Sequence, residues 1–115
     1  MEGCLFCDIA NRKIDARIVF EDEKVIAFND IAPQSPVHIL VIPKKHILSL
    51  TNVESREDYE YVAGIFSAMK KIVEEKNLDR SGFRVVVNHG KNAGQAVPHL
   101  HFHILGGRKL NWPPG

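Results

Sequence analysis

The stretch His99-Leu100-His101-Phe102-His103-Ile104-Leu105 dominates the interpretation of this chain, because imidazole and apolar side chains alternate along it. Successive side chains of a β-strand point to opposite faces of the sheet. A strand over residues 99–105 would place its three histidines on one face and the apolar residues between them on the other. Three adjacent imidazoles are costly as plain surface, since they crowd groups that can become charged near neutral pH. The pattern therefore predicts a strand that is packed on one face and reactive on the other.

Three interpretations of this histidine face are open at this point. It could be the polar side of a half-exposed strand, or a metal face, since zinc enzymes use closely spaced histidines as ligands. It could also serve nucleophilic catalysis, because a neutral imidazole nitrogen attacks phosphorus and leaves again, which suits a two-step transfer. The second ring nitrogen would then have to donate to a fixed acceptor such as a backbone carbonyl. We favour catalysis by one of the three imidazoles.

The rest of the chain predicts a single α+β domain over residues 1–115, with a mostly antiparallel five-stranded sheet. Ser55 followed by acidic residues predicts the N-cap of a long amphipathic helix, which ends near Asn77. The near-continuous apolar run over residues 38–42 predicts a strand that is buried on both faces. The remaining expected elements are a short helix over 6–13 and strands over 18–20, 25–28, 83–87 and 99–105.

Composition narrows the range of partners. The chain has 115 residues, 44% of them apolar and 25% charged, which fits one globular domain. Its net charge of +1 gives no strong field for nucleic acid or acidic membranes. No apolar run approaches the roughly 20 residues that span a bilayer, and the first residues do not read as a secretory signal. We therefore expect a cytoplasmic protein without a nucleic-acid or membrane partner.

The histidine stretch and several other blocks resemble the histidine triad (HIT) family, and within it the branch of histidine triad nucleotide-binding proteins. The resemblance covers nearly the whole chain, and the order of the blocks makes it more specific than the histidines alone. Besides the histidine stretch, the blocks that carry it are Phe28-Asn-Asp30-Ile-Ala-Pro33-Gln-Ser-Pro36, Val41-Ile-Pro43-Lys-Lys-His46, Asn88, Gly94-Gln-Ala-Val97, Leu105-Gly-Gly-Arg108 and Trp112-Pro-Pro-Gly115.

This resemblance implies an enzyme that hydrolyses purine nucleoside 5'-phosphoramidates through a nucleotidyl-histidine on His101. It implies that His103 contacts the phosphate and the leaving group, and that Asn88 positions the phosphate or the nucleophile. Backbone amides near Gly94, Gln95, Ala96 and Val97 would supply further donors to the developing charge. Many relatives carry a serine at the position of Ala96 that is thought to help protonate the leaving amine, so its absence bears on the preferred leaving group.

The nucleoside would be bound by an acid and an apolar slot. Asp30 lies at the end of an expected strand, where a carboxylate can accept both ribose hydroxyls, although a turn-capping role is the alternative. Ile18, Phe20, Phe28 and Ile31 are candidates for the slot around the base, with ordinary core packing as the alternative, above all for Ile18 and Phe20.

The resemblance also implies a homodimer in which the sheets of two subunits join. The C-terminal tail with Trp112 would then reach the active site of the partner subunit, and packing on its own subunit is the alternative. Two other functions stay open: a dinucleoside polyphosphate hydrolase or nucleotidyl transferase, and a zinc-stabilised nucleotide-binding scaffold with little turnover.

Cys4 and Cys7 form a C-x-x-C pair at the start of the chain. Two thiolates at this spacing suit one tetrahedral zinc ion, with His46 and His99 as candidates for the other two ligands. Some bacterial-type members of the family carry a structural zinc on such a set, which would make His99 structural rather than catalytic. A redox pair is the competing interpretation, but such pairs normally follow a strand and open a helix.

Overall fold

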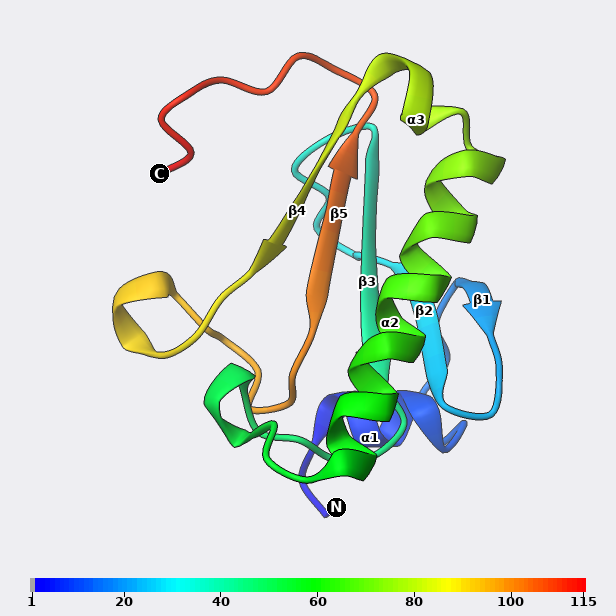
Figure 1. The fold of residues 1–115 in the computed structure, drawn as a ribbon, viewed down its shortest axis with the longest axis vertical. Coiled ribbons are helices and arrows are strands. Elements are labelled where there is room, and N and C mark those ends of the chain that lie inside the picture. Colours follow the sequence, from blue (N-terminus) through cyan, green and yellow to red (C-terminus); the bar gives the residue numbers. More distant parts are fainter. Residues whose placement is uncertain (1) are drawn as a thin grey trace.

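The computed structural model describes residues 2–115 and shows an α+β fold built on one antiparallel sheet, as predicted (Figure 1). The strands lie in the order β1-β2-β3-β5-β4, and all neighbouring pairs are antiparallel. Helix α2 covers one face of the sheet, and the short helix α1 packs on the other. The elements are α1 (Leu5–Ala10), β1 (Ile18–Glu21), β2 (Val25–Asn29), β3 (Val37–Pro43), α2 (Arg56–Glu75), α3 (Leu78–Ser81), β4 (Phe83–Val87) and β5 (Phe102–Gly106).

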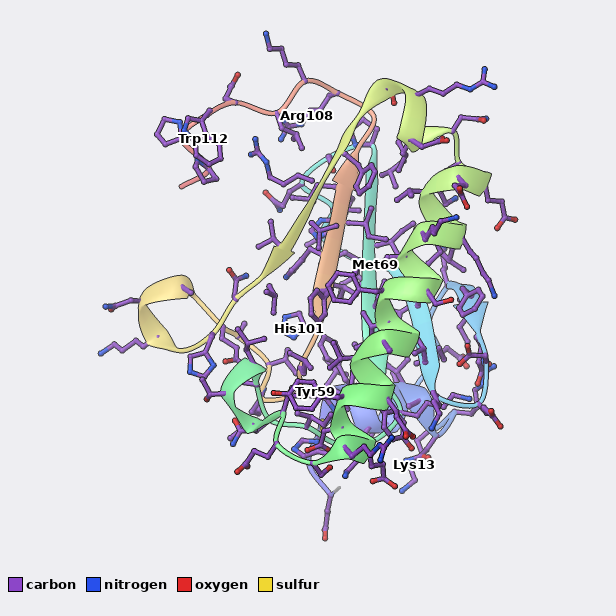
Figure 2. The ribbon with its side chains drawn as sticks, viewed as in Figure 1. Lys13, Tyr59, Met69, His101, Arg108 and Trp112 are labelled. Atoms are coloured by element: carbon purple, nitrogen blue, oxygen red, sulfur yellow. The ribbon has the colours of Figure 1, made fainter. Side chains whose placement is uncertain are left out.

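The central strand β3 is buried on both faces, which confirms the prediction from its continuous apolar run. Ile39 and Val41 pack in the core beneath α2, together with Met69 of that helix (Figure 2). Leu40 and Ile42 pack in a second, smaller core beneath α1. The sheet therefore separates two apolar layers, and the smaller layer adjoins the histidines.

Helix α2 begins as predicted, because Ser55 and Asp58 form a reciprocal capping box. The helix α3 and two 3-10 turns, over Leu50–Asn52 and Lys91–Ala93, were not predicted. Single-turn helices are too short for a periodic apolar pattern to develop. Among residues 2–115, no helix combines the length and the apolar character needed to cross a membrane.

Two expected boundaries are wrong. The helix α1 ends at Ala10 rather than Lys13, because Arg12 takes a left-handed backbone conformation with φ 61°. The histidine strand joins the sheet only at Phe102. Before that point the N–H of Leu100 donates to Ile47 O, in the loop after β3, over 2.6 Å. The alternation of side chains nevertheless continues through this segment, since Leu100 packs under α2 with Phe102 and Ile104.

Candidate active site

His101 is buried, and its ring donates a hydrogen bond to the backbone of its own chain segment. Its Nδ1 lies 2.7 Å from the backbone oxygen of His99, and a carbonyl can only accept, so Nδ1 carries the proton. In the neutral ring, Nε2 is then left with its lone pair. The ring of Phe6 meets the His101 ring edge-on, with centroids 5.1 Å apart. His101 therefore has a fixed tautomer and a fixed plane, as a nitrogen nucleophile requires.

A second chain of hydrogen bonds fixes the tautomer of His103. The backbone N–H of Gln34 donates to Nδ1 of His38 over 3.0 Å, so the proton of a neutral His38 resides on Nε2. That Nε2 lies 2.8 Å from Nδ1 of His103 and donates to it. The proton of His103 must then be on its own Nε2, which is buried and has no partner among the described residues.

The two histidines of the strand thus offer complementary groups. The rings of His101 and His103 lie 5.1 Å apart, centre to centre. One presents a lone pair and the other presents an N–H donor. The sequence did not predict His38 as a member of this set, since it begins the run over residues 38–42 that was expected to be a buried strand.

Burial keeps the rings of His103 and His38 neutral. It lowers the pKa of His103 to about 4, with smaller contributions from the nearby His101 and His38, while the carboxylate of Asp30 acts in the opposite direction. Burial also lowers the pKa of His38, again opposed by Asp30. Both rings therefore stay neutral in the folded protein at a pH below about 6.5, where the same histidines in the unfolded chain would bind a proton.

This difference predicts that acid destabilises the fold. Between pH 6.5 and 4 the unfolded chain binds more protons than the folded one, so the free energy of unfolding falls as the pH falls. For His103 alone the loss amounts to about 2 kcal/mol. Urea unfolding at pH 7 and pH 4.5 should therefore give a smaller pH dependence for His103→Gln than for the wild type. Equal pH dependence in the two proteins would contradict the lowered pKa.

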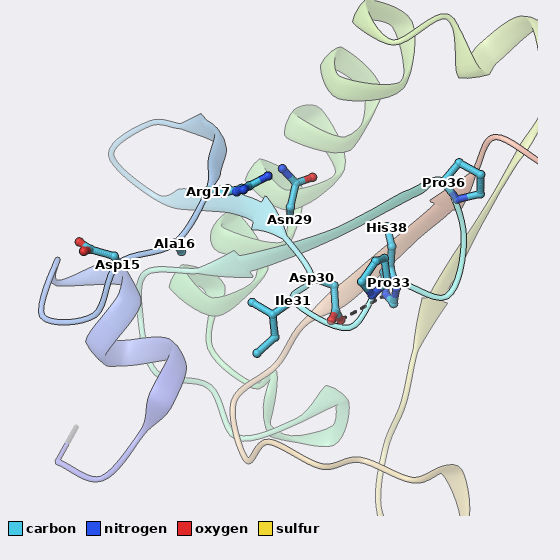
Figure 3. A pocket seen from close by; sticks show the side chains of 9 residues that line it. All are labelled: Asp15, Ala16, Arg17, Asn29, Asp30, Ile31, Pro33, Pro36 and His38. Atoms are coloured by element: carbon cyan, nitrogen blue, oxygen red, sulfur yellow. Dashed lines mark ion pairs between the residues drawn. The ribbon is translucent and has the colours of Figure 1, made fainter.

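Asp30 both caps a turn and lines a cavity. Its Oδ1 accepts from the N–H of Ala32 over 2.8 Å, and its Oδ2 lies 3.4 Å from Nε2 of His38 (Figure 3). The cavity has a volume of about 780 Å³ and extends from the loop of Pro33 to Arg17. One carboxylate oxygen of Asp30, Oδ1, therefore caps the turn, as the alternative interpretation expected. The other oxygen, Oδ2, faces His38.

An apolar cavity of about 280 Å³ adjoins Asp30. Phe28 and the fully exposed Ile31 line it, as does Val97. Ile18 packs in the layer on this side of the sheet but does not line the cavity, and Phe20 packs on the opposite face, against the core beneath α2. Most of the remaining wall comes from residues that sequence reasoning missed: Leu5, Phe6, Ile9, Ile14, Ala16 and Leu40.

The loop over residues 88–97 is held together by its own hydrogen bonds, and two backbone amides near its end are candidate donors to a ligand. The N–H groups of Gly94 and Gln95 donate within the loop, and the Gln95 side chain ties the loop together. The N–H groups of Ala96 and Val97 have no partner within residues 2–115. Asn88 follows β4 directly, and since β4 pairs Val87 with Phe102, the next residues outward are Asn88 and His101.

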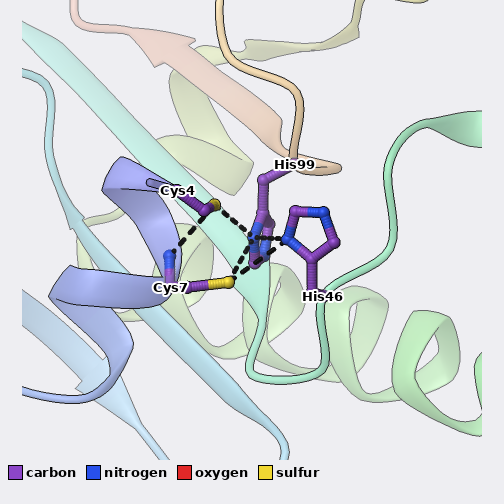
Figure 4. Close-up of side chains that lie close together, drawn as sticks. All are labelled: Cys4, Cys7, His46 and His99. Carbon is purple, nitrogen blue, oxygen red and sulfur yellow. Dashed lines mark hydrogen bonds between the residues drawn. The ribbon is translucent and has the colours of Figure 1, made fainter. Parts of the chain in front are cut away.

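Four side chains of the kinds that can hold a metal ion converge beside this site. Cys4 and Cys7 come from the start of α1, His46 from the loop after β3 and His99 from the segment before β5 (Figure 4). The Nδ1 of His99 lies 3.3 Å from Sγ of Cys4 and 3.4 Å from Sγ of Cys7. The Nδ1 of His46 lies 3.2 Å from both Sγ of Cys7 and Nδ1 of His99. The set predicted from the sequence is thus brought together.

The side chains of this cluster fit a metal cation with tetrahedral coordination. With usual zinc bond lengths, the edges of a tetrahedron of two sulfurs and two nitrogens measure about 3.3 to 3.8 Å, close to the distances observed. His99 donates from Nε2 to the oxygen of Pro43 over 2.9 Å, so its Nδ1 lone pair points into the cluster. Burial lowers the pKa of His99 to about 4, which keeps the ring in the neutral form that binds a metal.

The C-terminal tail lies beyond the β4 edge of the sheet (Figure 2). Trp112 is 79% exposed, and the guanidinium of Arg84 on β4 lies 5.9 Å from its ring centre. Arg84 also donates to the backbone oxygen of Asn111 over 3.0 Å. The tail is therefore attached to the outer strand of its own subunit.

Buried histidines lie beside Asp30 and two adjoining cavities on a small α+β fold, and comparison with known proteins gives the family. The HIT domain matches residues 11–110, and the chain belongs to the HIT family. An uncharacterised HIT-like protein of Synechococcus elongatus is 46% identical over 99% of this chain and 98% of its own length.

Solved structures agree with this assignment. A HIT family hydrolase from Legionella pneumophila superposes with a TM-score of 0.93 at 46% identity, covering 98% of this chain and all of the other. A histidine triad protein from Clostridium difficile gives 0.91 at 47% identity, covering 96% of each chain. The protein thus has the fold of HIT family hydrolases.

Proposed function

We propose that the protein hydrolyses purine nucleoside 5'-phosphoramidates through a nucleotidyl intermediate on His101. The observation that carries this proposal is the pairing of two fixed tautomers: a lone pair on His101 Nε2 beside an N–H on His103 that has no partner in the described part of the chain. A nucleophile next to a proton donor is what the cleavage of a phosphorus–nitrogen bond requires, since the amine must leave with a proton.

The reaction has two steps. His101 Nε2 attacks the α-phosphorus, the phosphorus–nitrogen bond breaks, and the amine leaves with the proton of His103 Nε2. A neutral His38–His103 pair would become negatively charged on giving up this proton, so the pair must first bind one additional proton. The negative charge of the bound phosphate favours the binding of that proton. Water then attacks phosphorus and returns a proton to His103, and the bond to His101 breaks, releasing the nucleoside monophosphate.

The surroundings support this assignment of groups. The positive charge on His101 in the intermediate is stabilised by the hydrogen bond from Nδ1 to His99 O. The N–H groups of Ala96 and Val97 are the donors for the phosphoryl oxygens, and Asn88 adds a side-chain amide. The purine would occupy the 280 Å³ apolar cavity, and Asp30 Oδ2 would accept from the ribose hydroxyls.

We also propose that the protein is a homodimer joined through β4. This strand is at the edge of the sheet and exposes Phe83 and Val85, and Phe66 of α2 is exposed as well. An edge with exposed apolar side chains is a site for pairing with another strand. The tail that is attached to Arg84 would then extend toward the partner's site. A monomer by light scattering would contradict this arrangement.

The four-residue cluster is proposed to hold a structural zinc ion. Zinc favours two thiolates with two imidazoles in a closed tetrahedral site. Neither Cys4 nor Cys7 forms a disulfide, which fits a reducing compartment such as the cytoplasm.

Metal analysis tests this assignment directly. Protein prepared with zinc should contain about one equivalent per chain, and Cys4→Ala should contain less than about 0.2. A wild type below that lower value after a metal-replete preparation would contradict the zinc site.

Turnover of a fluorogenic adenosine 5'-phosphoramidate tests the reaction itself. Release of the amine together with adenosine monophosphate would support it. An inactive wild type that still binds nucleotide would favour a nucleotide-binding scaffold with little turnover. Cleavage of diadenosine polyphosphates in place of phosphoramidates would favour a dinucleoside polyphosphate hydrolase.

A further inference from the structure

His99 belongs to two sites at once. Its ring nitrogen Nδ1 points into the cysteine and histidine cluster, and its backbone oxygen accepts the proton that fixes the tautomer of His101. The side chain is fully buried, and its Nε2 donates to Pro43 O. A change in the position of this residue would therefore move the acceptor of His101, because ring and carbonyl belong to one residue in an irregular segment before β5.

Phe6 makes a second connection between the same two sites. It lies between Cys4 and Cys7 on α1, and its ring meets the rings of both His99 and His101 edge-on, at 5.9 and 5.1 Å. It also lines the apolar cavity. The helix α1 has only six residues, too few to be stable without tertiary contacts. The cluster attaches this helix to the sheet.

We propose that the cluster, loaded with its metal, is a positioning device for catalysis: His99 holds the tautomer of His101, and Phe6 holds the plane of that ring and one wall of the base cavity. This inference rests on the proposed zinc site and on the proposed role of His101. It assigns the cluster a role in the chemistry and in nucleotide binding, beyond the stability of the fold.

The test compares the tautomer of His101 with and without the metal. The imidazole nitrogens of ¹⁵N-labelled protein are observed at pH 8, and His101→Ala identifies the signal. Zinc-loaded wild type should show one tautomer, protonated on Nδ1. In Cys7→Ala we expect a mixture of tautomers, weaker binding of adenosine monophosphate by calorimetry and a loss of about 10- to 100-fold in turnover.

Two further variants separate positioning from general instability. Ile72→Ala removes a buried side chain from the core on the opposite face and should lower the melting temperature while keeping the tautomer, nucleotide affinity and turnover. His46→Ala removes a ligand that lies in the loop after β3 and does not alter α1. It should show the effects expected for Cys7→Ala, and it replaces that variant in the test if Cys7→Ala does not fold.

The proposal is overturned by a folded, zinc-free variant in which His101 keeps its single tautomer and nucleotide affinity is unchanged. This spectroscopic result does not depend on turnover. An inactive wild type would therefore overturn the proposed reaction while the positioning role could still be decided.

Discussion

Replacement of His101 by alanine is expected to abolish phosphoramidate hydrolysis while nucleotide binding is largely retained. The variant lacks the Nε2 lone pair that forms the intermediate, and loss of a nucleophile typically lowers kcat by at least about 10⁴-fold. The apolar cavity and Asp30, which would bind the nucleoside, are unchanged. Steady-state turnover and calorimetric titration with adenosine monophosphate measure the two effects separately.

Two controls make this result specific. His89→Ala changes an exposed histidine of the loop after β4 and should keep turnover within about twofold, as surface substitutions do. The smaller His101→Gly leaves space for free imidazole, which should restore part of the activity if the missing group is an imidazole.

Rapidly quenched wild type should carry one nucleotidyl group by mass, and His101→Ala none. Comparable hydrolysis by His101→Ala would refute the nucleophile assignment.

The sequence was sufficient to predict the five strands and their mostly antiparallel arrangement, apart from the start of the histidine strand, because the signals for strands are local. The alternation around His101 and the continuous apolar run of β3 each follow directly from the geometry of a strand. The start of α2 was equally readable, since its capping box is formed by two residues three positions apart. The short helix α3 has no comparable local signal, and it was not predicted.

The candidate active site could be predicted only in part, because its hydrogen bonds join distant segments. His38 and His103 are 65 residues apart, and nothing in the spacing indicates that Nε2 of one lies 2.8 Å from Nδ1 of the other. The role of Phe6 in the cavity also depends on where α1 packs. The cluster of Cys4, Cys7, His46 and His99 was predicted from the C-x-x-C spacing with the two histidines as candidate ligands, and the structure brings the four side chains together.

The His38–His103 contact leads to the second prediction with a large effect. His38→Leu removes the donor to Nδ1 of His103, so the proton of His103 can move to Nδ1, where it cannot reach the leaving amine. Proton transfer by a positioned side chain typically contributes about 10²- to 10⁴-fold, and we expect kcat to fall by about 10²-fold or more. The affinity for nucleotide should change little by comparison.

A matched variant and a second substrate distinguish this effect from a disturbed fold. In His38→Gln the amide oxygen can accept from Gln34 N–H and the amide nitrogen can donate to His103, so turnover should exceed that of His38→Leu by about tenfold. A p-nitrophenyl ester of adenosine monophosphate has a leaving group that departs without a proton, so the three proteins should hydrolyse it at similar rates. An equal loss on both substrates would mean that His38 supports the fold around His101, and that His103 is not the proton donor.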